Sequence, residues 1–187
     1  MVGYRAWDLS VVGMPGDYQR FRISSIIMKG ELAIWKADMV ASCFYGEVAA
    51  HLRNPGLSEG HLCGIYSLKT LDSVIKEFSF SSFGVDIKIY GSIYNYGTVL
   101  EGTLGFRSSR ARVMSFIRID IPCCFCGLKS SSYLLVEGSC LWSACELCTK
   151  ILGTRLLPYT KAIEIISLDF VYLWLSYTYG EVPVVRK

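Results

Sequence analysis

Two closely spaced cysteine pairs constrain this chain more than any other feature of its sequence. The first pair, Cys123 and Cys126, lies in the run CCFCG, and the second pair, Cys145 and Cys148, lies in CELC. Two intervening residues let both sulfurs of one tight turn point at a single ion, at about 2.3 Å for zinc. The two turns are separated by eighteen residues, which is the spacing of a four-cysteine zinc ribbon.

The residues between the two pairs predict the hairpin of such a ribbon. Residues 131–137 and 140–143 have the pattern of two strands, with a glycine-containing turn between them. Cys124 and Cys140 are not metal ligands in this interpretation, because the two-residue spacing selects Cys123 as the partner of Cys126. Two alternatives are cysteines buried as small apolar side chains and a redox-active CxxC turn. The paired turns argue against the first, and the lack of a βαβ pattern argues against the second.

A second candidate metal site combines both histidines of the chain with its two remaining cysteines outside the ribbon segment. These four residues fall within one short window, as Cys43, His51, His61 and Cys63. Two imidazoles and two thiolates suit tetrahedral zinc. The alternative is ordinary packing, with both cysteines buried and both histidines at the surface or in a loop. Four protein ligands would make a closed structural site, whereas an open position would suit a zinc-dependent hydrolase or nuclease.

The bulk composition limits the class of protein. A chain of 187 residues suits one domain, or one domain with a small module. Apolar residues make up 52% and charged residues 19%, which is typical of a globular chain. The formal net charge of +3 becomes nearly neutral once four thiolates and one zinc ion contribute about −2. Charge alone therefore gives little support for a nucleic-acid partner.

Two observations bear on location. The N-terminal residues MVGYRAWDLS contain no signal-peptide run. The most apolar stretch, 162–179, is interrupted by Glu164 and Asp169 and is too short for a transmembrane helix of about 20 apolar residues. We therefore expect a cytoplasmic protein with no membrane partner, in which eight cysteines indicate metal binding rather than disulfides.

The residue pattern predicts an α+β fold with a β-rich core, two helices and the inserted ribbon. We divide the chain into a β-rich domain at 1–121 with one helix, the ribbon at 122–150, and a C-terminal helix and strand at 151–187 that pack back on the core. Two helices follow from apolar spacing, at 67–78 and 159–179. The expected strands include 23–28, 31–35, 85–90, 92–96 and 182–185.

Several short motifs are similar to those of an uncharacterised family found widely in actinobacteria and their phages. They are GYRAW at 3–7, Cys43 and His51, CGIYSLK at 63–69, YGSIYNYGTVLEGTLGFRSSRA at 90–111 and YGEVPVV at 179–185. That family typically has a Trp-Gly strand followed by Gly-x-Arg-Ala. Here Tyr90 replaces the tryptophan, His61 stands where the family has cysteine, and Glu181 interrupts the last motif. The resemblance implies a similar order of motifs along the chain, and it implies no activity.

The densest cationic run supplies candidate nucleic-acid contacts, Arg107, Arg110 and Arg112. Guanidinium groups bind phosphates, and the nearby Tyr94, Tyr96 and Phe106 offer rings for base stacking. The alternative is a solvated strand face above core tyrosines. The sequence contains no nucleotide-binding glycine loop and no catalytic histidine motif, so a nucleotide cofactor is not expected and a non-enzymatic role is favoured.

Together these features predict a zinc-stabilised binding or adaptor module. It would act with nucleic acid or a nucleic-acid-processing complex, and it would hold one zinc ion, or two if the Cys43–Cys63 cluster binds metal. One alternative is the zinc-dependent hydrolase or nuclease built on that cluster. Another is a structural protein of a phage or a large complex.

Overall fold

The computed structural model describes residues 1–12, 20–24, 34–41, 64–78, 87–136, 140–156 and 163–187. These residues form ten strands and three helices, which confirms the α+β class expected from the sequence. The strands make two sheets, one of seven strands and one of three. Within the described ranges, no helix has the length and apolar character needed to cross a bilayer.

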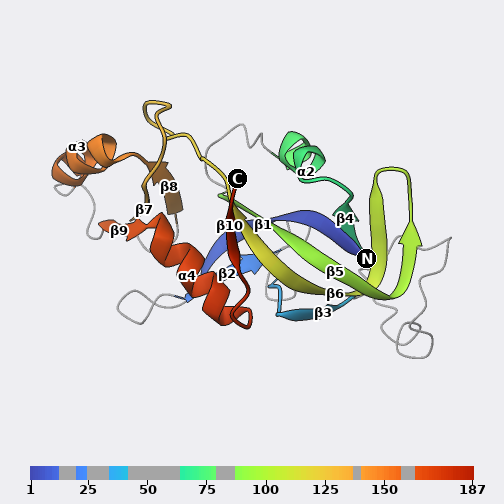
Figure 1. Cartoon of the computed structure of the whole chain (residues 1–187). Helices are drawn as coiled ribbons and strands as arrows, with labels where there is room; N and C mark the ends of the chain where they lie inside the picture. Colours follow the sequence, from blue (N-terminus) through green and yellow to red (C-terminus); the bar gives the residue numbers. More distant parts are fainter. Residues whose placement is uncertain (13–19, 25–33, 42–63, 79–86, 137–139, 157–162) are drawn as a thin grey trace.

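A long antiparallel hairpin organises the larger sheet (Figure 1). Its strands are β5 (Lys88–Glu101) and β6 (Gly105–Arg118). β5 pairs on its other side with β1 (Val2–Val12), and β1 pairs in turn with β2 (Arg20–Ser24). The outer edge of β6 pairs with three short strands in succession: β4 (Ile65–Leu68), β3 (Asp38–Val40) and the parallel β10 (Val184–Arg186).

The larger sheet closes on itself, because β4 also pairs with β1 at Tyr4 and Leu68. Strands β1, β5, β6 and β4 therefore form a circuit with a small interior. Asn95 occupies that interior, donating from Nδ2 to the Ser67 hydroxyl at 2.9 Å and accepting from the Ser108 hydroxyl at 2.9 Å. All three side chains are buried, and each hydrogen bond offsets the cost of removing these polar groups from water.

The two faces of β1 pack against different layers, because successive side chains of a strand point to opposite faces. Ala6 faces α2 (Leu71–Phe78), whose Val74 is fully buried beside it. Trp7 faces the main core, where its ring contacts Phe116 edge-on at 6.3 Å between centroids. Helix α4 (Leu168–Thr178) packs against this second face, in contact with β2 and β6.

The smaller sheet contains the segment between the cysteine pairs. Its central strand β7 (Ser132–Val136) pairs with β8 (Cys140–Ala144) on one side and with β9 (Ile163–Ser167) on the other. Helix α3 (Glu146–Leu156) follows β8, at the left of Figure 1. Buried side chains of this sheet, such as Tyr133 and Leu141, belong to the same hydrophobic cluster as Trp7. The two sheets therefore share one core.

The predicted helix at 67–78 begins later than expected. Ser67 and Leu68 lie in β4, where they pair with Phe106 and Gly105 of β6. Thr70 then accepts a hydrogen bond from the Ser73 backbone N–H at 3.2 Å, which is the contact of an N-cap residue. Leu68 thus belongs to a strand, although its apolar spacing continued that of the helix.

The helix predicted over 159–179 is wrong in its first part. The described residues also contain three helices, whereas the sequence predicted two. Residues 163–167 form β9, and the Ser167 hydroxyl accepts from the backbone N–H of Asp169 at 3.1 Å, so that α4 starts at Leu168. Gly180 ends α4 with a φ of 91°, as expected. The additional helix, α3, has a weak apolar stripe, which is why periodicity did not reveal it.

Candidate metal centre

Four cysteines converge at the base of the β7–β8 hairpin. The sulfurs of Cys123, Cys126, Cys145 and Cys148 all lie within 4.8 Å of one another. Sulfurs placed tetrahedrally around zinc at about 2.3 Å are about 3.8 Å apart, and the Sγ atoms of Cys126 and Cys145 are separated by 3.6 Å. The cysteines are free thiols, not disulfides. The cluster therefore has the ligand type, number and spacing to hold a metal ion.

The first cysteine pair lies on a tight turn fixed by backbone hydrogen bonds. The N–H of Cys123 donates to the Leu128 carbonyl at 2.6 Å, and the N–H of Gly127 donates back to the Cys123 carbonyl at 2.9 Å. Gly127 has a φ of +78°, a conformation that favours glycine. The turn is joined to the hairpin by the Cys124 N–H, which donates to the Ser143 carbonyl at 3.0 Å.

The second pair lies where β8 passes into α3. Cys145 immediately precedes the helix, and its sulfur accepts a hydrogen bond from the Cys148 backbone N–H at 3.4 Å. This is the position of an N-cap side chain. The start of α3 thus brings the last two sulfurs toward the first pair.

The pKa values of Cys123, Cys126 and Cys148 are shifted in different directions. Burial raises the pKa of the Cys123 thiol, but backbone N–H groups of Cys145, Phe125 and Cys126 outweigh it and lower that pKa to about 6. The side chain of Cys126 raises the pKa of Cys148. The N–H of Leu128 lowers the pKa of Cys126, but burial and the neighbouring thiols leave it raised. Crowded thiolates repel one another, and a divalent cation supplies the charge that removes this repulsion.

The cluster is part buried and part open to solvent. Cys123 and Cys145 are 2% and 6% exposed, whereas Cys126 is exposed. Cys124 of the CCFC run is also exposed and is not among the four clustered cysteines. The spacing argument that chose Cys123 over Cys124 is therefore confirmed by the geometry. The other candidate ligands, Cys43, His51, His61 and Cys63, lie outside the described residues.

The structure places two of the three candidate arginines together. Arg110 and Arg112 are exposed on β6, with the buried Ala111 between them. Arg107 lies three residues before Arg110, beyond the register irregularity between Tyr96 and Val99 of β5, and its cross-strand neighbours are Leu100 and Tyr66. Arg118, further along β6, forms an ion pair with Asp169. Arg110 and Arg112 thus form a pair, and Arg107 is separate from them.

The tyrosines named from the sequence lie beside that arginine pair. On β5, Tyr94 is the cross-strand neighbour of Arg112 and Tyr96 is the neighbour of Arg110. Phe106 lies at the other end of β6, under the Lys69 ammonium at 5.7 Å. Sequence reasoning missed Asp38, whose carboxylate accepts a hydrogen bond from the Tyr96 hydroxyl. Nothing in the pattern of β3, a three-residue strand, indicated this partner.

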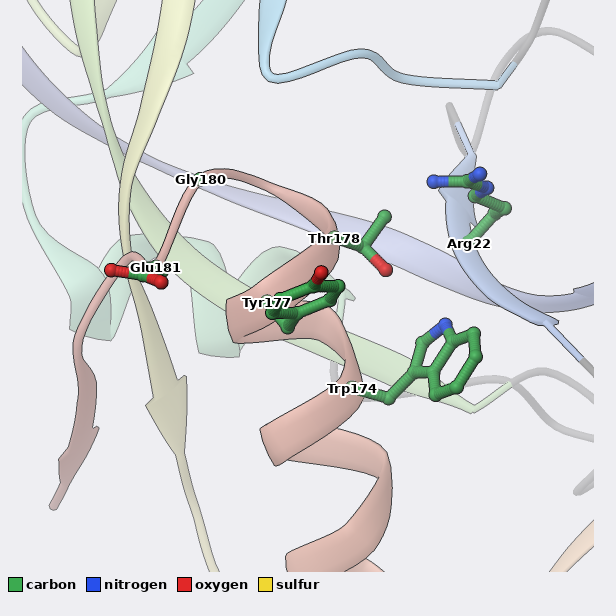
Figure 2. Close-up of a pocket in the computed structure, with 6 residues that line it drawn as sticks. All are labelled: Arg22, Trp174, Tyr177, Thr178, Gly180 and Glu181. Carbon is green, nitrogen blue, oxygen red and sulfur yellow. The ribbon is translucent and has the colours of Figure 1, made fainter.

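An open pocket of about 670 Å³ lies beside the end of α4 (Figure 2). Its lining comes from β2 and from the segment that ends α4: Arg22, Trp174, Tyr177, Thr178, Gly180 and Glu181. The charged groups of Arg22 and Glu181 lie on opposite sides of the Tyr177 ring in Figure 2. They do not converge on one point, as the groups of a catalytic pair would.

Comparison of the chain with protein-family models, with curated proteins and with solved structures gave no match. The functional interpretation therefore depends on the geometry of the chain itself.

Proposed function

We propose that the four-cysteine cluster binds one Zn²⁺ as the structural staple of a zinc ribbon, and that the protein is a nucleic-acid-binding module. The observation that carries the metal assignment is the approach of four free thiols to within 4.8 Å. Zinc is the metal that four thiolates in a tetrahedron hold most commonly in structural sites. With four protein ligands, no coordination position is left for water, so the role is structural and not catalytic.

The staple would fix the hairpin to the turn that precedes it. Besides the cysteines, the two are joined by the Ser143 hydroxyl, which donates to the Pro122 carbonyl at 2.8 Å. On the opposite edge of β8, the Ser131 N–H donates to the Ala144 carbonyl at 3.0 Å, which extends the pairing with β7. Since Tyr133 and Leu135 of this hairpin are part of the main core, a metal that orders the hairpin also stabilises the larger sheet.

The nucleic-acid assignment depends on the exposed pair Arg110 and Arg112. Guanidinium groups bind phosphate with two parallel hydrogen bonds, and both side chains are exposed on one strand. Strand β6 carries four arginines and no acidic residue. The exposed face of β6 therefore suits a phosphodiester backbone, which a strand rich in acidic residues would repel.

Native mass spectrometry of protein purified without chelator tests the metal assignment. We expect the mass of one zinc ion per chain, and a second ion would extend metal binding to the Cys43–Cys63 cluster. An iron mass would retain the cluster but replace the metal. A metal-free chain after purification in zinc-containing buffer would overturn the assignment.

Fluorescence anisotropy with labelled oligonucleotides tests the nucleic-acid assignment. We expect binding that weakens as salt rises from 50 to 200 mM, because phosphate contacts release counterions. Absence of binding at 50 mM salt would reject the nucleic-acid role and leave the zinc assignment unaffected.

A further inference from the structure

One exposed face of the larger sheet gathers aromatic and cationic side chains from three neighbouring strands. β5 contributes Tyr94 and Tyr96, β6 contributes Arg110 and Arg112, and β3 contributes Asp38. The side chains between them on the same strands, such as Asn95 and Ala111, point inward and are buried. We call Tyr94, Tyr96, Arg110 and Arg112 the Tyr–Arg platform.

The two rings of the platform are nearly parallel. Their centroids lie 6.2 Å apart with an interplanar angle of 18°, and Tyr94 is 38% exposed. Residues two apart along a strand point to the same face of the sheet, so both rings lie on that one face. An aromatic face that water reaches is a surface on which a flat, unpaired base stacks favourably.

Contacts within the platform hold the rings in place. The Arg112 guanidinium lies over the Tyr94 ring, 5.4 Å from its centroid. Tyr96 is held by its hydroxyl, which donates to Asp38, and this hydrogen bond raises the pKa of Tyr96. Rings that are already fixed lose little conformational entropy when a ligand binds. The platform is therefore preorganised.

The strands beneath the platform are fixed as well. Asn95, which lies between the two tyrosines, is anchored to Ser67 and Ser108 inside the closed circuit of strands. Adjacent strands lie about 4.8 Å apart, so β3, β6 and β5 make a surface about 10 Å wide. The four residues of the platform therefore lie on two paired strands of a fixed sheet.

We propose that the Tyr–Arg platform binds single-stranded nucleic acid, with unpaired bases stacked on Tyr94 and Tyr96 and the phosphates beside them held by Arg110 and Arg112. This inference rests on the proposed nucleic-acid role and narrows its substrate class. Bases in a duplex are stacked on one another and are not available to the rings, whereas unpaired bases are. Two arginines alone give a small electrostatic contribution, so stacking supplies most of the selectivity.

The test uses fluorescein-labelled oligo(dT) and oligo(U) strands and a duplex of the same length, titrated with the zinc-loaded full chain. The variants Tyr94→Leu and Tyr96→Leu remove the aromatic face but keep an apolar side chain of similar size. Each should weaken single-strand binding by about 5-fold to 150-fold, the equivalent of about 1–3 kcal/mol of base stacking. Tyr94→Phe and Tyr96→Phe keep the ring and should bind within about twofold of the native chain.

Matched controls lie elsewhere on the surface. Tyr177 on α4 is 76% exposed, and Tyr177→Leu should leave binding unchanged. Arg112→Gln should lower the slope of log K against log salt by about 0.7, the value for one phosphate contact on a single strand. Arg186→Gln, which changes an exposed arginine on β10, should not alter that slope. Because Arg112 is exposed, its variant carries the test if a tyrosine variant fails to fold.

The outcomes separate the two proposals. The platform is supported if the leucine variants bind the single strand more weakly while the phenylalanine variants bind it like the native chain. The duplex should not bind. Equal binding of the duplex, or leucine variants that bind like the native chain, overturns the platform and leaves the general nucleic-acid role standing. If the native chain binds neither strand nor duplex at 50 mM salt, the nucleic-acid role itself is wrong.

Discussion

Replacing Cys126 with serine should release the metal and destabilise the chain, and the structure allows the size of the effect to be worked out. Cys126 is exposed, so losing its sulfur removes almost no packing, and a surface substitution normally changes stability by less than about 0.5 kcal/mol. Any larger loss must come from the metal. Zinc held at about 1,000 times its dissociation constant stabilises the folded state by about 4 kcal/mol.

This loss should be visible as a lower melting temperature. For a chain of this size, each kcal/mol corresponds to about 2–4 °C, so Cys126→Ser should melt about 8–16 °C below the native chain in zinc-containing buffer. The hairpin shares the main core through Tyr133 and Leu135, so the whole transition should move rather than a local one. A chelator should lower the melting temperature of the native chain but not that of Cys126→Ser.

Cys124→Ser is the matched control for this prediction. Cys124 lies in the same turn and is also exposed, but it is not among the four clustered cysteines. It should keep one metal ion per chain and the native melting temperature. The reasoning is refuted if Cys126→Ser retains its metal and its melting temperature, or if Cys124→Ser loses as much as Cys126→Ser does.

Three further predictions test the fold. Gly91→Ala should cost about 1–3 kcal/mol, since a Cβ there would lie 2.3 Å from the Ser115 carbonyl oxygen, whereas Gly102→Ala, with its nearest neighbour at 3.7 Å, should be nearly neutral in urea titrations. Asn95→Ala should cost about 1–3 kcal/mol by removing the side-chain amide that bonds the buried Ser67 and Ser108 hydroxyls, and an unchanged urea midpoint would contradict this. Burial raises the pKa of Tyr133 and Tyr172 above 10.0, so the unfolded chain loses these protons first. The stability that the two neutral phenols contribute is therefore present below about pH 10, and the free energy of unfolding should fall above that pH; urea titrations from pH 8 to 11 that show no fall would exclude it.

The cysteine cluster could be predicted because its information is local. Two residues between cysteines fix which sulfurs of a turn face one another, and that rule chose Cys123 over Cys124 without any knowledge of the rest of the chain. The two hairpin strands were found for the same reason, since alternation and a turn act over a few residues. The second cysteine turn also begins α3, but the weak amphipathic pattern of that helix gave no signal.

Non-local pairing explains where the sequence was misleading. The apolar residues of 163–167 fit a helix as well as they fit a strand. They form a strand because β7, about 30 residues earlier in the chain, offers an unpaired edge with which they pair. Leu68 likewise continued the apolar stripe of α2, yet β4 pairs there with β1 and β6. Intrinsic propensity is a weak influence that such pairing overrides.

The sequence by itself determined the composition of the sites: four thiols at ribbon spacing, and arginines that alternate with apolar residues on one strand. Only the tertiary structure decided which of these groups act together. It placed Arg112 over Tyr94, separated Arg107 from the other two arginines, and gave Tyr96 its partner Asp38. The physical reason is that strand register sets these contacts, and register depends on the packing of both sheet faces rather than on any short run of residues.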